Sequence, residues 1–233
     1  MEEFLEACKV GLDNAEFLGA CKEGDLSKVA SLMLLTDPSC CNNHPIRITV
    51  GIRNVELARL LLTDPRVDPS ALDNDAIQWA CFAGYLDMVR ILLTDPRVDP
   101  SARNNCAIKI ASEHGHLEVV EVLLADPRVD PSGGNNEPLF RAIKNRRPEV
   151  VRLLLTDHRV DPTARCNYAI QLASQEGYTE IVQVLLEDPR VDPTDDDNDA
   201  IRRARYNGHT EVVQILTEYP FRLDGPIYNK GIM

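Results

Sequence analysis

The sequence predicts an all-α solenoid, in which short helix–turn–helix repeats stack in the order of the chain. Three observations predict this fold class. The hexapeptide Asp-Pro-Arg-Val-Asp-Pro recurs at intervals of 31 residues, an Asn recurs at the same interval, and each interval holds two short apolar stretches separated by a turn residue. Such a period is typical of stacked supersecondary units, so we expect function to lie on an extended surface.

The two recurring features keep the same register along the chain. The hexapeptide begins at Asp64, Asp95, Asp126, Asp157 and Asp188, with His158 replacing the first proline of the fourth copy. The Asn series is unbroken and consists of Asn43, Asn74, Asn105, Asn136, Asn167 and Asn198. Recurrence within one chain indicates which positions every repeat needs for stacking.

One repeat, taken from Asn74 onward, shows the expected local structure. Asn74 is a good N-cap, so a first helix is predicted from about Ala76 to Ala83. Gly84 ends that helix because glycine accepts a left-handed conformation without strain. A second helix is predicted from about Leu86 to Leu93, and the Asp-Pro that follows stops it. Helices this short do not persist alone in water, so each repeat requires neighbours.

The stretch Asn105–Leu124 resembles the ankyrin repeat. Its segment Gly115–Val120 reads Gly-His-Leu-Glu-Val-Val, which matches the turn and second helix of that family, and Gly208–Val213 does so again. Pro138-Leu139 restores the dipeptide that opens the family's first helix. The resemblance implies a stack whose concave face is formed by the first helices and the loops before them. It also implies a protein that binds another protein and catalyses nothing.

The repeats depart from the family in length. The usual ankyrin repeat has about 33 residues, and the two that are missing here fall in the loop between repeats. We therefore expect shortened inter-repeat loops in which the family's β-hairpin is weak. The predicted layout is an N-terminal capping helix at 1–13, a solenoid at 14–219 and a C-terminal tail at 220–233. About seven repeats are expected, starting near residues 14, 43, 74, 105, 136, 167 and 198.

Composition and charge narrow the class of partner. The formal net charge is −12, which disfavours nucleic acid and anionic membranes because both require a basic face. No stretch approaches 18 apolar residues, and the N-terminus lacks a secretory signal. The seven cysteines are irregularly spaced, which indicates a reducing environment. We expect a monomeric cytoplasmic protein, with a nuclear location as the alternative.

Candidate partner-binding residues lie where the repeats differ, because specificity needs differences between repeats. They come from the first helices just before the turn, from the position after the repeating Asn, and from the loop before it. Ordinary surface variation is the alternative explanation for each of them. The candidate residues are Phe82, His114, Lys144, Tyr168, Tyr206, Arg103 and Arg165.

Three further features each allow two explanations. Trp79 is either an interface residue or, as the apolar residues at its position in other repeats favour, partly core. Arg97 and its counterparts in the other hexapeptides form either a docking strip or an inter-repeat ion-pair network that orders the loops, and the second is favoured. Arg202, Arg203 and Arg205 either receive an acidic peptide or, as is more common, lie on a solvated helix face.

Signals for chemistry are weak, so no catalytic residue, metal site or cofactor is predicted. Cys40, Cys41 and His44 lack a fourth zinc ligand, and no phosphate-binding loop or nucleophile motif occurs. Two alternative roles remain: a regulatory subunit of an enzyme, and a substrate of Asn or Asp hydroxylation. The second rests on resemblance to hydroxylated ankyrin loops, and its candidates are Asp68, Asp99, Asp130, Asp161 and Asp192.

Overall fold

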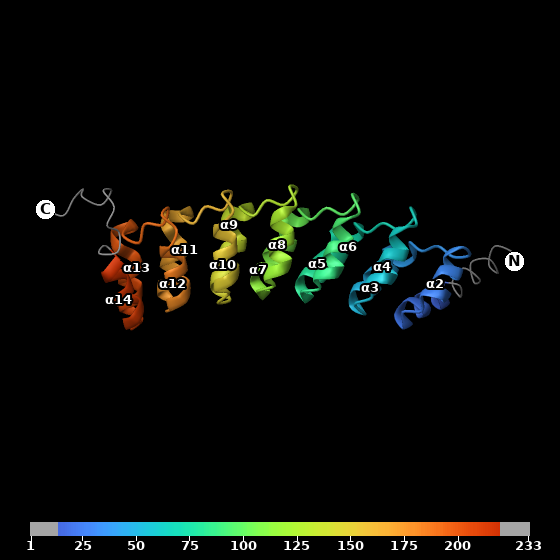
Figure 1. Ribbon diagram of the computed structural model, residues 1–233, viewed down its shortest axis with the longest axis horizontal. Coiled ribbons are helices and arrows are strands. Elements are labelled where there is room, and N and C mark those ends of the chain that lie inside the picture. The colour runs from blue at the N-terminus through green and yellow to red at the C-terminus, as the bar shows by residue number, and fades with distance from the viewer. Residues whose placement is uncertain (1–13, 220–233) are drawn as a thin grey trace. The chain divides into compact units, whose positions relative to one another are not determined.

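The computed structural model describes residues 14–219, which are helical apart from turns and loops, with no strand in that range. Residues 14–23 form the first helix of the first repeat. The helices that follow are short and alternate between first and second members of a pair (Figure 1): α2 (Leu26–Met33), α3 (Cys40–Gly51), α4 (Val55–Leu62), α5 (Ala71–Ala83), α6 (Leu86–Leu93), α7 (Ala102–His114), α8 (Leu117–Ala125), α9 (Gly133–Lys144), α10 (Pro148–Leu155), α11 (Ala164–Gln175), α12 (Thr179–Leu186), α13 (Asp195–Tyr206) and α14 (Thr210–Glu218). None of these helices is both long and apolar enough to cross a bilayer.

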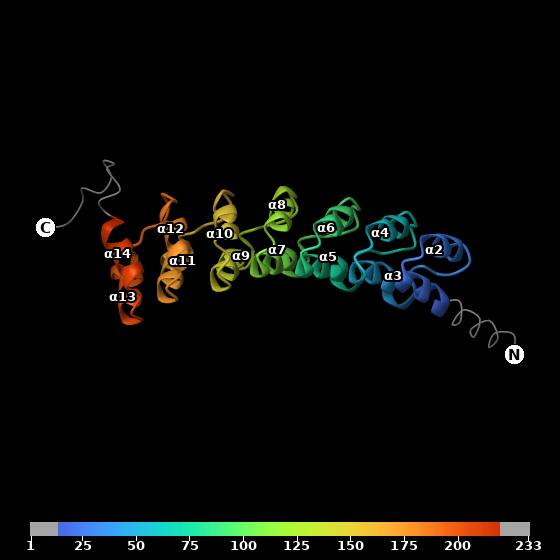
Figure 2. The ribbon, with the colours of Figure 1, turned by 60° about the horizontal axis from the view of Figure 1, so that its bottom comes forward.

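The described residues form two units, one of 14–111 with 118–129 and the other of 112–117 with 130–219. Within the first unit, α3 packs against α5, and α4 packs against both α2 and α6. Within the second unit, α11 packs against α9 and α13, and α12 packs against α10 and α14. Each unit therefore places its first helices in one row and its second helices in another (Figure 2). The all-α repeat fold is confirmed. The predicted capping helix and tail, at 1–13 and 220–233, lie outside the described residues.

The core of each unit is the apolar contact between these rows. In α5, Ile77 and Ala80 are fully buried, as the spacing predicts. In α6 the buried set is wider than the sequence pattern alone indicates, because Met88 and Ile91 are buried along with Val89 and Leu92. The flank of α6 is covered by α4, the second helix of the preceding repeat. Burying each large side chain contributes about 2 kcal/mol.

The right-handed first helix begins after Asn74, close to the predicted start, but Asn74 does not act as its N-cap. Leu72, Asp73 and Asn74 have φ values of 58°, 57° and 64°, so they form a single left-handed turn before the right-handed helix. The N–H of Asn74 donates across this turn to the Ser70 carbonyl, at 2.7 Å. The N-cap prediction was wrong because an N-cap has extended backbone, and Asn is also the residue that best tolerates the left-handed region.

The same left-handed turn recurs in six repeats, each time ending at the repeating Asn. For residues other than glycine this conformation costs roughly 1–2 kcal/mol per residue. Interactions with other parts of the chain must therefore hold it in place. The turns are at residues 41–43, 72–74, 103–105, 134–136, 165–167 and 196–198.

The repeating Asn supplies one such interaction. The side-chain oxygen of Asn74, which is buried, accepts a hydrogen bond from the backbone N–H of Asp99 in the next hexapeptide, at 2.7 Å. Asn136 does the same for Asp161, at 2.8 Å. A buried backbone N–H without a partner costs about 1–3 kcal/mol. Each Asn therefore fastens its own repeat to the loop that follows.

The arginine of each hexapeptide links its own loop to the loop of the preceding repeat. Arg97 donates from Nε and Nη2 to the carboxylate of Asp95, at 2.9 and 2.6 Å, and from Nη1 to the Val67 carbonyl of the preceding loop, at 2.5 Å. Arg190 reaches the Val160 carbonyl in the same way, at 2.8 Å. The expected inter-repeat ion-pair network thus needs correction. The ion pair lies within one loop, and the link between loops is a charge-assisted bond to backbone.

The turn between the two helices is kept in the fifth repeat, although Arg146 and Arg147 stand there in place of Gly-His. Arg146 replaces glycine there and takes the left-handed conformation, with φ 52°. The next N–H, of Arg147, donates to the Ala142 carbonyl at 2.9 Å, which is the bond that the glycine turns make. The Arg146 guanidinium lies over the Tyr178 ring, 5.3 Å from its centre. Such a cation–π contact offsets part of the backbone strain.

Candidate partner-binding surface

On the first unit, the exposed face of α5 carries two stacked aromatic rings. Trp79 and Phe82 stand one helical turn apart, and their ring centres are 5.4 Å apart with an interplanar angle of 24°. They are 51% and 45% exposed. Trp79 was expected to be partly core, but about half of its side chain is exposed, whereas Ile77 and Ala80 on the same helix are fully buried. The pair presents a large apolar surface on a rigid helix.

Arg103, also on the first unit, lies in the left-handed turn of the fourth repeat and contacts the equivalent turn of the third. Its Nη2 lies 3.4 Å from the Asp73 carboxylate and 3.4 Å from the Leu72 carbonyl. Both partners in this ion pair are well exposed, so the pair contributes little to stability. The pair adds polar groups to the loop edge of the same unit.

On the second unit, Arg165 and Tyr168 converge on one ring. Tyr168 meets Phe140 edge to face at 5.4 Å, and the Arg165 guanidinium lies 5.0 Å from the centre of that ring. Phe140 itself is buried. The sequence did not single out Phe140, although it stands where Gln78 and Gln171 stand in other repeats. Arg165 and Tyr168, both predicted candidates, therefore lie together against Phe140, which was not predicted.

A polar lattice covers much of the first-helix face of the second unit. Arg141 pairs with Glu137 on its own helix, at 3.1 Å, and with Glu113 of the preceding repeat, at 2.5 Å. Two repeats later, Arg203 makes the corresponding contacts with Asp199 and with Gln175, the second at 2.9 Å. Side chains of neighbouring first helices are therefore held in fixed positions.

The remaining candidates lie apart from one another. His114 stacks on His116 with ring centres 6.0 Å apart, Lys144 is exposed at the end of α9, and Tyr206 is 92% exposed at the end of α13. Phe82 and Arg103 belong to the first unit, and the other five candidates belong to the second. The structure groups the candidates into local sets, and their role in binding stays a prediction.

Sequence comparison identifies the repeats. The family profile described as "Ankyrin repeats (3 copies)" matches residues 97–166, and the one described as "Ankyrin repeat" matches residues 72–105. Residues 72–166 are ankyrin repeats. Among curated proteins, none matches the sequence of this chain.

Solved ankyrin structures extend the likeness beyond the matched residues. The chain is similar to the ankyrin repeat domain of Bcl-3, described as a unique member of the IkappaB protein family, with a TM-score of 0.71 and 26% identity over 86% of this chain and 97% of that one. It is also similar in fold to an ankyrin repeat domain from Acinetobacter baumannii AYE, with a TM-score of 0.62 and 20% identity over 76% of this chain and 98% of that one.

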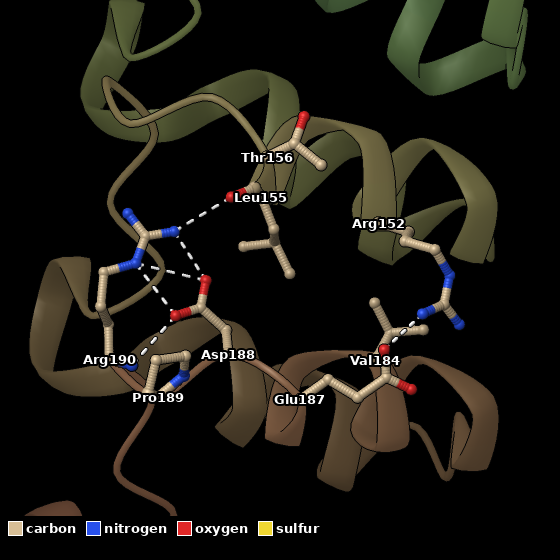
Figure 3. A pocket seen from close by; sticks show the side chains of 8 residues that line it. All are labelled: Arg152, Leu155, Thr156, Val184, Glu187, Asp188, Pro189 and Arg190. Atoms are coloured by element: carbon tan, nitrogen blue, oxygen red, sulfur yellow. Dashed lines mark hydrogen bonds and ion pairs between the residues drawn. The ribbon is translucent and has the colours of Figure 1, made fainter.

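A groove lies between the second helices of the ankyrin repeats in the second unit (Figure 3). Leu155, Val184 and Pro189 give it an apolar floor, with an Arg152–Glu187 pair at one end and an Arg190–Asp188 pair at the other. The same groove occurs between α4 and α6, three repeats earlier, where the corresponding positions are Arg59, Leu62, Thr63, Ile91, Thr94, Asp95 and Pro96. The groove therefore arises from the packing of second helices in neighbouring repeats, and it does not mark one repeat as a specific site.

Groups suited to metal binding or nucleophilic chemistry do not gather in the described part of the chain. No cluster of three or more His, Cys, Asp or Glu able to hold a metal occurs among residues 14–219. Burial raises the pKa of Cys21 to about 12 and that of Cys40 to about 11. These thiols are therefore protonated at neutral pH, and thiols react and bind metals as thiolates.

The hydroxylation candidates are engaged in the loop turns of the ankyrin repeats. Asp99, for example, accepts from the N–H and the hydroxyl of Ser101, at 2.9 and 2.6 Å. Its own N–H is bound by Asn74. A modifying enzyme would have to open this turn. The hydroxylation role stays a prediction.

Proposed function

We propose that this chain is a protein-binding module, which presents the exposed faces of its first helices to a partner and performs no catalysis. The observation that carries the proposal is the Trp79–Phe82 stack, two large aromatic side chains half exposed on α5. Aromatic residues are enriched at protein interfaces and dominate their binding energy. Exposing them on a soluble surface has a cost unless a partner covers them.

The repeat family supports this proposal. Ankyrin repeats are protein interaction modules, and the chain shares their fold along most of its length. The hydrogen bond that Asn74 accepts from the Asp99 N–H and the one that Arg97 donates to the Val67 carbonyl link neighbouring repeats, so the first helices need little rearrangement on binding. A preorganised surface loses less conformational entropy when a partner docks. An adaptor, a scaffold and an inhibitor would all use such a surface.

Quantitative affinity capture from cells of the source tests the proposal. Trp79→Ala with Phe82→Ala removes the aromatic pair, and Leu34→Ala with Leu35→Ala removes comparable exposed apolar surface at the end of α2 as a matched control. We expect the first variant to capture at least about tenfold less of the specific partner than the wild type does, since anchor residues contribute about 2 kcal/mol or more to binding. The control should retain it. Equal recovery of the partner with both variants would show that the aromatic pair is not part of the binding surface.

A further inference from the structure

An open groove of about 400 Å³ lies between the first helices α11 and α13 of the second unit. Gln175 lines it from α11, and Arg202, Arg203 and Tyr206 line it from α13. The corresponding positions one repeat earlier hold Gln171, Leu172 and Gln175 in place of the two arginines and the tyrosine, as the 31-residue period shows. This groove therefore belongs to one repeat, unlike the groove between the second helices.

Among the residues that the structure describes, the lining of this groove holds two guanidinium groups and no carboxylate. Asp199 accepts from both arginines, from Arg202 at 2.9 Å and from Arg203. The carboxylate is only 13% exposed, whereas the Arg202 side chain is 54% exposed. One carboxylate neutralises one of two guanidinium groups and fixes both. Arg205, exposed on the same helix, adds a further positive charge, and Asp196 and Asp197 at the start of α13 add two negative charges near Arg202.

Tyr206 adds an apolar element to the same lining. It follows Arg202 by four residues and Arg203 by three, which places all three on one side of α13. Its side chain is almost completely exposed, at 92%. A tyrosine with this exposure presents a ring face to a neighbour and a hydroxyl to water. The combination of fixed guanidinium groups and an exposed ring suits a peptide with both acidic and apolar side chains.

We propose that this groove binds an acidic segment of the partner protein, with carboxylates on Arg202 and Arg203 and an apolar side chain on the Tyr206 ring. The proposal rests on the proposed function, since it names the chemistry of a bound partner. Charge complementarity supports the choice, because guanidinium groups bind carboxylates in well-defined geometry. The chain as a whole carries a charge of −12, so an acidic peptide is attracted only where basic side chains gather, as they do at this groove. A nucleic acid would require a much larger basic face.

Fluorescence anisotropy with two labelled peptides tests the inference on the full chain. One peptide alternates Glu with Leu, and the other alternates Lys with Leu. At low salt, the Glu peptide should bind the wild-type chain and the Lys peptide should not bind to this groove. Arg202→Gln with Arg203→Gln, and separately Tyr206→Ala, should each weaken binding of the Glu peptide about tenfold or more. Added salt should weaken binding to the wild-type chain because the contacts are ionic.

A matched control carries Arg59→Gln with Arg90→Gln, which removes two exposed charges from second helices of the first unit. It should bind the Glu peptide as the wild type does, and equal melting temperatures would establish that all variants are folded. The inference is overturned if the groove variants and the control bind the Glu peptide equally, or if the wild type does not bind it. Self-association of the wild type that the groove variants abolish would instead assign the groove to a second copy of this chain.

The outcome is separable from that of the proposed function. If partner capture is lost with Trp79→Ala and Phe82→Ala but unchanged with the groove variants, the inference fails and the proposed function stands. If no variant of either surface changes capture, both fail. If capture is lost with the groove variants, the partner's acidic segment is assigned to this site.

Discussion

At the scale of single residues, the repeating Asn does two things that few side chains can combine. It adopts the left-handed conformation that ends the turn, and its buried side-chain oxygen binds the N–H of a loop 25 residues later. Asp shares the backbone tolerance but would bring a charge into the buried site. Glycine shares the tolerance but has no acceptor. The unbroken series of Asn along the chain follows from these two requirements.

Replacing Asn136 by Ala should destabilise the fold by about 1–3 kcal/mol, since the N–H of Asp161 loses its partner in a buried site. Asn135→Ala is the matched control. Asn135 has the same left-handed backbone, with φ 63°, but its side chain is exposed. Asn135→Ala should lose only the unfolding free energy that reflects the poorer tolerance of Ala for left-handed backbone. Urea unfolding measures both, and equal losses of unfolding free energy would disprove the role of the Asn136 side chain.

The turn glycines differ in what surrounds them, which gives a second matched pair. A Cβ on Gly177 would come within 2.7 Å of Cγ of His209, whereas a Cβ on Gly208 would meet nothing within 4 Å. Both have positive φ, 71° and 77°. Gly208→Ala should therefore cost only the left-handed strain, about 1–2 kcal/mol. Gly177→Ala should cost more because the imidazole must also move. Thermal unfolding compares them, and a larger loss for Gly208→Ala would contradict the packing described for His209.

The Asn series is evident in the sequence, but the N-cap role predicted for it was wrong. The pattern of Asn followed by an apolar helix is the same for an N-cap and for the end of a left-handed turn. Leu72 and Arg103 precede Asn in two of these turns, and neither residue type signals positive φ. Their conformation depends on hydrogen bonds to a loop one repeat away. A local sequence pattern contains no information about such contacts.

At the scale of elements, the hexapeptide is a compact polar link between repeats. Each one joins an arginine to the carboxylate two residues before it and then to a carbonyl of the preceding loop, as Arg97 shows. The bond from Arg97 holds the pKa of Asp95 below its ordinary value. Asp126 and Asp157 are shifted in the same direction by their own arginines. In place of the predicted inter-repeat ion-pair network, each loop is closed by its own ion pair and is linked to the preceding loop through a backbone carbonyl.

These carboxylates predict how stability depends on pH. Their pKa is lower in the folded chain than the value of about 3.9 in the unfolded chain, so their contribution is complete above that value and is lost as pH falls through the folded pKa. We expect little change from this source between neutral pH and about pH 5 and a decline below about pH 4. Asp95→Asn should be less stable at neutral pH and should decline less steeply in acid.

Urea unfolding at a series of pH values measures this dependence. Asp87→Asn, an exposed position in the first turn of α6, is the control outside the loops. A decline for Asp95→Asn as steep as that of the wild type would show that the loop carboxylate does not govern acid stability.

At the scale of the whole molecule, the 31-residue period was sufficient to predict the repeat fold, because stacked repeats require the same residues at the same positions. The candidate surface was only partly predictable. Phe82 and Tyr206, singled out from variation between repeats, are exposed, but Trp79 was expected to be partly core, and Phe140 was not singled out. Whether an apolar side chain in a first helix is buried depends on the volume already filled by its neighbours. A single sequence does not give that volume.

The central claim is that the first helices carry the binding surface. Site-specific photo-cross-linking in source cells tests it most directly, with a photoreactive phenylalanine at Phe82 or Tyr206 on first helices, and at Arg90 or Glu180 on exposed positions of second helices. The account predicts that a partner protein is cross-linked from at least one of the two first-helix positions and from neither second-helix position. Cross-links from Arg90 or Glu180, with none from Phe82 and Tyr206, would contradict it.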